Sequence, residues 1–184
     1  MNQYKILEKQ IYSSGDFSIV PIRFEDRFSI MNWRNEQMYH LRQSNKLTID
    51  KQNEYFSNIV SKLFHQELPK QLLFSFLEND NCIGYGGLVH INWIDKNAEI
   101  SFIMDTKLEK QKFEFYWTKY LKLIEELAFK ELSLHKIVTY AFDLRPHLYE
   151  VLELNGFTKE STLKEHCFFN GKYIDVVTHR KLNK

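Results

Sequence analysis

The sequence predicts one mixed α/β domain of the α+β type over residues 1–184, with helices that flank a mostly antiparallel sheet. Three observations lead to this prediction. Hydrophobic residues make up 43% of the 184 residues, which is enough for a substantial core. Short apolar segments separated by turn residues fill the middle of the chain. A strand pattern, a long amphipathic helix and another strand pattern then follow, and this order predicts a parallel crossover.

The charge balance and the cysteines exclude several classes of protein. The chain has 25 Lys and Arg against 24 Asp and Glu, a formal net charge of +1, which argues against a general nucleic-acid binder. Cys82 and Cys167 lie too far apart in sequence for a metal cluster and indicate reduced thiols. The sequence shows no signal-peptide pattern and no long apolar span. We therefore expect a cytoplasmic protein without metal, membrane or nucleic-acid partner.

The first third of the chain predicts one strand and two helices. Residues Phe17–Arg23 are apolar and β-branched, and Pro21 indicates an edge position. Acidic residues open a helix over 25–35, where negative charge suits the helix N-terminus. A second helix over 48–64, capped by Thr48 or Asp50, has apolar residues at helical spacing and is stopped by the proline at position 69.

The rest of the chain predicts the remaining sheet and two more helices. An antiparallel meander is expected from three strands, Leu72–Leu77, Cys82–Ile91 and Ala98–Met104, because turn residues separate them. The later elements are a helix over 114–131, a strand Ile137–Phe142 buried on both faces, a helix Pro146–Leu154, and a hairpin of Glu165–Phe169 and Tyr173–His179 around Asn170-Gly171.

Four short motifs, in order, resemble one enzyme family. They are Cys82-Ile-Gly-Tyr-Gly-Gly-Leu88, Ala98-Glu-Ile-Ser-Phe102, Leu152-Glu-Leu-Asn-Gly-Phe157 and Asn170-Gly-Lys-Tyr-Ile-Asp-Val176. Together they are similar to the GNAT N-acetyltransferases, in the branch of the ribosomal-protein N-terminal acetyltransferases. The resemblance implies a GNAT fold with a splayed pair of parallel strands, and acetyl-CoA as the co-substrate.

The resemblance also implies where acetyl-CoA would bind. The pantetheine arm would pair with the first splayed strand, at Ile100, Phe102, Ile103 and Met104. The pyrophosphate would lie at the start of the following helix. The family has a glycine-rich loop there, whereas this chain has a glycine-free segment that supplies Lys107, Lys110, Gln111, Lys112 and Phe113. Arg145 replaces the family's asparagine and would meet a phosphate instead.

Three residues are candidates for proton transfer. Glu99 alternates with apolar neighbours on its strand, so a partly desolvated carboxylate there would accept the ammonium proton; the alternative is a structural salt bridge. His90, at the end of the preceding strand, would line the acceptor pocket or be a surface residue. The family's general acid is a tyrosine at the position of Leu152. Tyr149, one helical turn earlier, is the candidate here, with a structural tyrosine as the alternative.

The acceptor is suggested by a Trp-Arg-Asn segment at the end of the first helix. It resembles GNAT enzymes that act on nucleotide-linked amino sugars, in surface-glycan synthesis in bacteria. Five residues would bind the acceptor: Trp33, Arg34, Asn35, Tyr39 and Arg42. The alternatives are acetylation of a protein N-terminus or another small amine, and a non-catalytic binding module that kept the fold. A homodimer is a further expectation.

Overall fold

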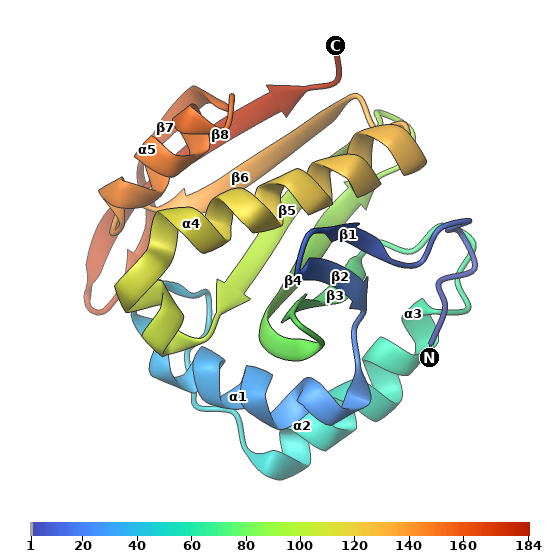
Figure 1. Cartoon of the computed structure of the whole chain (residues 1–184). Coiled ribbons are helices and arrows are strands. Elements are labelled where there is room, and N and C mark those ends of the chain that lie inside the picture. Colours follow the sequence, from blue (N-terminus) through green and yellow to red (C-terminus); the bar gives the residue numbers. More distant parts are fainter. Residues whose placement is uncertain (1) are drawn as a thin grey trace.

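The computed structural model describes residues 2–184 as one eight-stranded sheet with helices packed against it (Figure 1). The strand order is β1-β2-β3-β4-β5-β6-β8-β7, and β5 and β6 are the parallel pair. The predicted mixed, mostly antiparallel α/β fold is confirmed. The strands are β1 (Tyr12–Ser14), β2 (Phe17–Pro21), β3 (Leu72–Glu78), β4 (Asn81–Asn92), β5 (Asn97–Met104), β6 (Lys136–Phe142), β7 (Thr158–Phe169) and β8 (Lys172–Leu182).

Helices from different parts of the chain pack against the sheet. In Figure 1, α4 crosses in front of β5 and β6, and α1 and α2 lie together on the lower side of the molecule. The elements are η1 (Phe24–Asp26), α1 (Arg27–Glu36), η2 (Met38–His40), α2 (Ile49–Tyr55), η3 (Phe56–Val60), α3 (Ser61–Leu63), α4 (Thr106–Glu125), η4 (Glu126–Glu131) and α5 (Pro146–Leu154).

The sheet begins with a short strand, β1, that the sequence did not predict. β1 pairs antiparallel with β2 through Tyr12 and Ile19, across a turn in which Gly15 has a positive φ of 60°. β2 ends at Pro21, two residues earlier than predicted. Ile22 donates its N–H to Leu73 in β3, and successive N–H groups alternate sides. The nitrogen of Pro21 therefore faces away from β3, toward the side on which β1 has already ended. Because no strand lies there to accept a hydrogen bond, the missing N–H of the proline costs no strand pairing.

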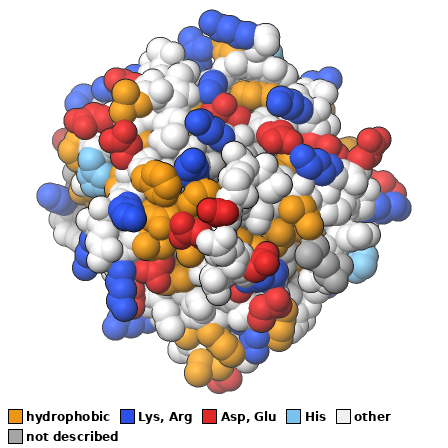
Figure 2. Space-filling model, viewed as in Figure 1, with side chains coloured by type: hydrophobic (Ala, Val, Ile, Leu, Met, Phe, Trp, Pro, Cys, Tyr) orange, Lys and Arg blue, Asp and Glu red, His pale blue; other side chains and the backbone are white. Residues whose placement is uncertain are grey.

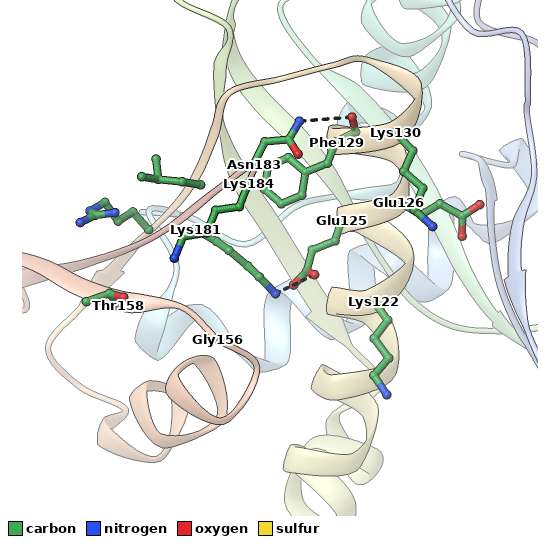
Figure 3. Close-up of a pocket in the computed structure, with 12 residues that line it drawn as sticks. Lys122, Glu125, Glu126, Phe129, Lys130, Gly156, Thr158, Lys181, Asn183 and Lys184 are labelled. Atoms are coloured by element: carbon green, nitrogen blue, oxygen red, sulfur yellow. Dashed lines mark hydrogen bonds and ion pairs between the residues drawn. The ribbon is translucent and has the colours of Figure 1, made fainter.

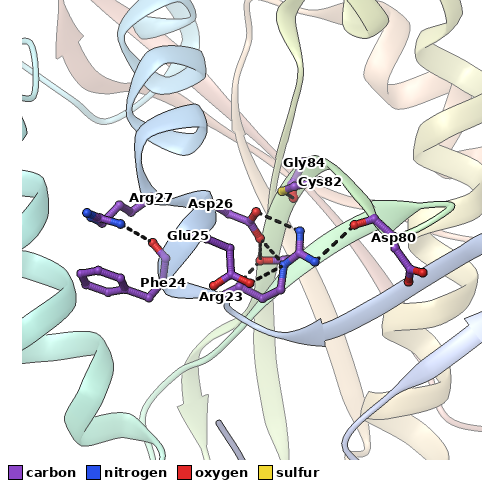
Figure 4. A network of polar contacts seen from close by, with 9 residues as sticks. Arg23, Phe24, Glu25, Asp26, Arg27, Asp80, Cys82 and Gly84 are labelled. Carbon is purple, nitrogen blue, oxygen red and sulfur yellow. Dashed lines mark hydrogen bonds and ion pairs between the residues drawn. The ribbon is translucent and has the colours of Figure 1, made fainter. Parts of the chain in front are cut away.

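The turn after β2 is held by a buried ion pair rather than by a helix cap (Figure 4). Arg23 donates to both carboxylate oxygens of Asp26, at 2.7 and 2.9 Å, and to the Asp80 carbonyl at 3.2 Å. The Ser75 hydroxyl in β3 donates to the same carboxylate at 2.6 Å. The expected helix start near Glu25 is therefore a 3-10 turn, and α1 begins at Arg27.

The predicted second helix forms with its predicted cap. The Thr48 hydroxyl accepts the Lys51 N–H at 3.3 Å, and the helical segment runs through α2, η3 and α3 to Leu63. It ends well before Pro69. The central meander β3-β4-β5 is confirmed as antiparallel.

Helix α4 starts eight residues earlier than the sequence predicted. The segment expected to be a phosphate loop forms the first turns of α4, because the Asp105 carboxylate accepts the N–H groups of Lys107 and Leu108 at 2.7 and 3.4 Å. The helix is interrupted only at Lys112, where φ is −144° and ψ is 43°. A side-chain cap thus takes the place of the glycines that the family uses.

The C-terminal elements follow the prediction closely. α5 begins with Pro146 and stops at Asn155-Gly156, where Gly156 has a φ of 81°. The hairpin turn is at Asn170-Gly171, with φ of 49° and 80°, but its strands are longer than predicted. β6 was expected to be buried on both faces, and it is not, because Val138 and Tyr140 are only half-buried.

The core between α4 and the sheet is aromatic. Phe102 of β5 stacks on Tyr120 of α4 with ring centroids 3.8 Å apart, and meets Trp117 edge-on at 4.9 Å. Gly86 in β4 allows this approach, since a Cβ there would lie 2.0 Å from the Ser101 carbonyl oxygen and 2.5 Å from the Tyr120 hydroxyl. This packing anchors β5 between β4 and α4.

On the face that Figure 2 shows, basic and acidic side chains lie interspersed, which agrees with the net charge of +1. Within residues 2–184, no helix is long and apolar enough to cross a membrane, and no group of metal-binding side chains is found.

We predict that Asp26→Ala lowers the free energy of unfolding by about 2–4 kcal/mol, because it leaves half-buried Arg23 and buried Ser75 without this acceptor. Urea unfolding measures this change. The control is Glu25→Ala, since this neighbouring carboxylate is exposed and lies 3.7 Å from Arg23. Equal losses in both variants would contradict the structural role of the Asp26 network.

Candidate functional site

The parallel strands β5 and β6 separate in the middle of the sheet. They pair only at Asn97–Lys136, Ala98–Ile137 and Glu99–Val138. Beyond that point β5 stays paired with β4 as far as Met104, and β6 stays paired with β8 as far as Phe142. The two facing edges therefore have backbone N–H and C=O groups free for a ligand. The expected opening between the two strands is present.

A narrow cavity of about 100 Å³, here called the slot, occupies this opening. The Thr139 hydroxyl oxygen beside it is buried and has no hydrogen-bond partner among residues 2–184. An extended arm with amide groups fits such a slot, because it would pair with the free strand edges and with this hydroxyl. The slot is lined by His40, Leu41, Arg42, Glu99, Ile100, Ser101, Phe102, Trp117, Thr139, Tyr140, Ala141, Phe142, Arg145 and Leu148.

Glu99 lies where the strands begin to separate, and its carboxylate contacts Arg42 and His90. Its carboxylate accepts from Arg42 at 2.5 Å and contacts the His90 Nδ1 at 2.9 Å. Its side chain is 13% exposed, whereas that of His90 is 66% exposed. Arg42 also lies over the Tyr140 ring, 4.6 Å from the centroid. Sequence reasoning placed Glu99 and His90 at one site, and the structure brings them together with Arg42.

A second buried carboxylate, Glu109 of α4, contacts two residues that line the slot, Arg145 and His40. Its Oε1 accepts from Arg145 at 3.2 Å and from the Tyr39 hydroxyl at 3.3 Å. It therefore ties the segment after α1 to the start of α5. Burial lowers the pKa of Arg145, and the Glu109 carboxylate opposes that shift.

His40 contacts the same carboxylate without forming an ion pair. The His40 Nε2 lies 3.8 Å from Glu109, but burial, followed by the nearby Arg145 charge, lowers the pKa of His40 from 6.5 to about 3. The imidazole is therefore neutral near pH 7.

The two tyrosines near the slot differ in where their hydroxyls lie. Tyr140 lines the slot, with its hydroxyl 3.2 Å from the Cys167 sulfur. Burial, and then the Cys167 thiol, raise the pKa of Tyr140 to about 12. The Tyr149 hydroxyl instead donates to Asp143 at 3.0 Å, and its ring stacks on buried His179. Tyr149 does not line the slot, so the structure does not place it with the other candidate catalytic residues.

The candidate cofactor residues divide into three groups. Ile100, Phe102 and Arg145 line the slot. Ile103 and Met104 are buried outside it, and the Met104 carbonyl already accepts the Gln37 amide at 2.7 Å. The Met104 carbonyl therefore already has one side-chain donor, and pairing of the arm with β5 as far as Met104 stays a prediction.

The remaining cofactor candidates lie on the outer surface of α4. Lys107 and Lys110 are exposed on its first turns, where Asp105 takes up the helix N–H groups. Gln111, Lys112 and Phe113 line a shallow groove of about 570 Å³ at the kink. Any phosphate would thus meet lysine side chains rather than a glycine loop.

Three of the five candidate acceptor residues have internal partners away from the slot. The Trp33 indole is 8% exposed and donates to Asp105 at 3.2 Å. Arg34 donates to Gln43 at 2.9 Å and to the Tyr85 hydroxyl at 2.6 Å. Asn35 binds the backbone of Leu47. Trp33 and Asn35 therefore hold α1 and the following loop in place.

Tyr39 and Arg42 do face a groove that continues from the slot. This acceptor groove has a volume of about 870 Å³, and Arg42 and Phe142 line both the slot and the groove. Tyr39 is 52% exposed and Phe168, on the hairpin, is 67% exposed. The groove is lined by Met38, Tyr39, Leu41, Arg42, Gln43, Ser44, Phe142, His166, Cys167, Phe168, Phe169 and Asn170.

A larger groove on another side of the molecule is separate from this site. It lies between the C-terminal half of α4 and the end of β8 and has a volume of about 890 Å³ (Figure 3). Lys181 reaches across it to Glu125 at 2.7 Å, and Asn183 donates to the Phe129 carbonyl at 3.4 Å. No residue lining it lines the slot.

Sequence reasoning missed Thr139, Tyr140 and Glu109. Thr139 and Tyr140 had a usable signal, because they stand at the carboxyl end of a parallel strand, where open α/β sheets bind ligands. Glu109 had none, since a glutamate in a lysine-rich segment reads as a solvated residue. Only its contacts with Tyr39 and Arg145 show otherwise.

An eight-stranded sheet whose one parallel pair opens around a slot is the architecture that the sequence analysis expected of an acyl-CoA-dependent N-acetyltransferase. The chain belongs to the family described as the acetyltransferase (GNAT) domain, which matches residues 19–178. The expected enzyme class and acetyl-CoA as co-substrate are thereby confirmed at the level of the family.

The relatives are acetyltransferases of polyamines. The spermidine N(1)-acetyltransferase of Vibrio cholerae is 31% identical over 118 residues, which are 64% of this chain and 66% of that protein. A crystal structure of spermidine N-acetyltransferase from Vibrio cholerae with CoA and spermine has a TM-score of 0.77 at 23% identity, covering 92% of this chain and 97% of that chain. A dodecameric structure of the Vibrio cholerae enzyme in an intermediate state has a TM-score of 0.74 at 22% identity and covers 92% and 95%.

These structures show that this chain and the Vibrio cholerae enzyme have the same fold. The expected likeness to enzymes of nucleotide-linked amino sugars is not supported by the relatives, whereas acetylation of a small amine, which the sequence left open, agrees with them. The homodimer stays a prediction.

We predict that His40→Gln makes the stability of the protein less dependent on pH between about 3 and 6.5. The folded-state pKa of His40 is lowered, so the unfolded chain binds more protons in this range, and stability is present above pH 6.5 and lost as pH falls. Within this range His40 changes the free energy of unfolding by about 1.4 kcal/mol per pH unit. Urea unfolding at several pH values measures the slope.

His179, whose pKa burial also lowers, keeps its contribution in both proteins and serves as the internal reference. An unchanged slope in His40→Gln would contradict a buried, neutral His40.

Proposed function

We propose that this protein transfers the acetyl group of acetyl-CoA to a primary amine of a small aliphatic polyamine. The opening between β5 and β6 carries the proposal, since it leaves a slot for the thioester arm next to an acceptor groove. The similarity to spermidine N-acetyltransferase supports the choice of amine.

The residues around the slot supply the two proton transfers that the reaction needs. The amine nitrogen attacks the thioester carbonyl, and Glu99 takes the proton that the ammonium loses, with exposed His90 passing it to solvent. The carbon–sulfur bond breaks, and the thiolate takes a proton from the Tyr140 hydroxyl, which is protonated at neutral pH. The products are the acetylated amine and free CoA.

The acceptor groove suits an alkylammonium chain. Aromatic rings of Tyr39, Phe142, Phe168 and Phe169 line it, and ring faces attract ammonium groups. Arg42, at the junction with the slot, is already neutralised by Glu99. An acceptor amine that reaches Glu99 would take the place of Arg42 or His90 on that carboxylate.

Three of the residues that suggested an amino-sugar nucleotide, Trp33, Arg34 and Asn35, line neither the slot nor the acceptor groove. Arg34 and Asn35 are bound to Gln43, Tyr85 and Leu47, so neither is placed to hold the phosphates of an acceptor in the acceptor groove.

Turnover measurements with matched acceptors test the proposed function. CoA release is followed with spermidine, spermine, a UDP-amino sugar, and a short peptide with a free N-terminus, each with acetyl-CoA. We expect kcat/KM to be highest for a polyamine. A higher kcat/KM for the amino sugar or the peptide would contradict the polyamine proposal, and the absence of turnover with every amine, together with no acetyl-CoA binding, would favour the non-catalytic module.

We predict that Tyr140→Phe lowers kcat by about 10²-fold with a small change in KM, because proton transfer contributes about 10²–10⁴-fold to a rate. The matched variant is Tyr149→Phe, which removes a hydroxyl that binds Asp143 outside the slot. Its kcat is expected to stay near that of the wild type. A loss in Tyr149→Phe with an unchanged Tyr140→Phe would instead assign the general acid to Tyr149.

A further inference from the structure

A second cavity, distinct from the slot and the acceptor groove, lies between α1, α2 and the sheet. Its volume is about 240 Å³, and no residue that lines it lines the slot or the acceptor groove. Tyr85 of β4, which pairs with Ile103 of β5, forms part of its wall. The cavity is lined by Ile22, Ile30, Arg34, Leu47, Lys51, Gln52, Tyr55, Phe56 and Tyr85.

The polar lining of this cavity is cationic. Arg34 and Lys51 both line it, and no Asp or Glu does. Arg34 is half-buried and donates only to neutral acceptors, from Nε to Gln43 and from Nη1 to the Tyr85 hydroxyl. Within residues 2–184, neither Arg34 nor Lys51 has a carboxylate within 4.0 Å.

Four of the five other arginines have a carboxylate partner, whereas half-buried Arg27 resembles Arg34 and donates to Asn53 and to the Phe24 carbonyl. Arg23 pairs with Asp26, Arg42 with Glu99, and Arg145 with Glu109. A guanidinium taken partly out of water without a counter-charge costs free energy, which a bound anion offsets. Arg34 is thus a cation whose charge partner is absent from the chain that the structure describes.

The Arg34 fork also has the geometry for an oxyanion. Its Nη2 has no partner among the described residues, and a planar guanidinium binds carboxylate or phosphate oxygens through parallel N–H groups. Lys51, on the first turn of α2, adds a flexible second charge. The rest of the wall is apolar or aromatic and includes Ile22, Ile30, Leu47 and Phe56.

We propose that this cavity binds a small organic anion, with its carboxylate or phosphate on Arg34 and Lys51 and its apolar body against the aliphatic and aromatic wall. The volume is below the range of about 300–1,000 Å³ of drug-sized pockets, so the ligand is a small metabolite. The same charges repel a polyamine. The proposal is therefore independent of the proposed acceptor and concerns a different ligand.

Calorimetric titration of the full chain tests this site with three probes of similar shape. Benzoate carries a carboxylate, phenyl phosphate carries a phosphate, and benzamide carries no charge. We expect one of the two anions to bind at least about tenfold more tightly than benzamide, because a charge-assisted bidentate bond distinguishes them. The stronger of the two anions identifies the class of ligand.

Variants of the two cations connect that binding to the cavity. Arg34→Met is expected to weaken the Kd of the preferred anion about tenfold or more, and Lys51→Met to weaken it by about threefold. Lys51 is exposed, so its variant keeps the fold even where Arg34→Met does not. The matched control is Lys62→Met, an exposed lysine on α3 outside the cavity.

Either of two results would overturn the proposal. One is that neither anion binds more tightly than benzamide. The other is that Lys51→Met binds the preferred anion as tightly as Lys62→Met does. Turnover with polyamines is measured separately, so a failure of the anion site does not bear on the proposed function.

Discussion

The end of hydrogen bonding between β5 and β6 after Glu99 and Val138 is the constraint on which the site depends. A gap inside a sheet is stable only if each strand is held on its other side, and β4 and β8 provide that support. The stacking of Phe102 on Tyr120 fixes β5 further. The unpaired backbone edges therefore face the slot alone, where an extended arm can take the place of a missing strand.

Two glutamates connect the slot to the segment after α1. Glu99 of β5 binds Arg42, and Glu109 of α4 accepts from Tyr39 and Arg145. Tyr39 and Arg42 also line the acceptor groove. The segment after α1 thus contributes to the walls of both the slot and the groove, and two separate carboxylates hold it in place.

Local pattern predicted most of the fold. Turn residues marked the β3-β4-β5 meander, Thr48 marked the start of α2, and Asn170-Gly171 marked the final hairpin. The boundaries that were wrong depend on side-chain contacts between distant residues or on caps. Asp105 extends α4 over the expected phosphate loop, and Asp26 binds Arg23 and Ser75 instead of capping α1. Motif resemblance also assigned Trp33 and Asn35 to an acceptor, whereas their partners are internal.

The sequence alone determined the order of the strands and main helices from β2 onward and the parallel crossover, because periodicity and turn chemistry act between near neighbours. The family resemblance placed the opening beside Glu99. Only the tertiary structure decided which tyrosine faces the slot, that Glu109 is buried against Arg145, and that Arg34 has no carboxylate partner among residues 2–184. These properties depend on contacts between residues far apart in the chain, whose distances and burial no local pattern encodes.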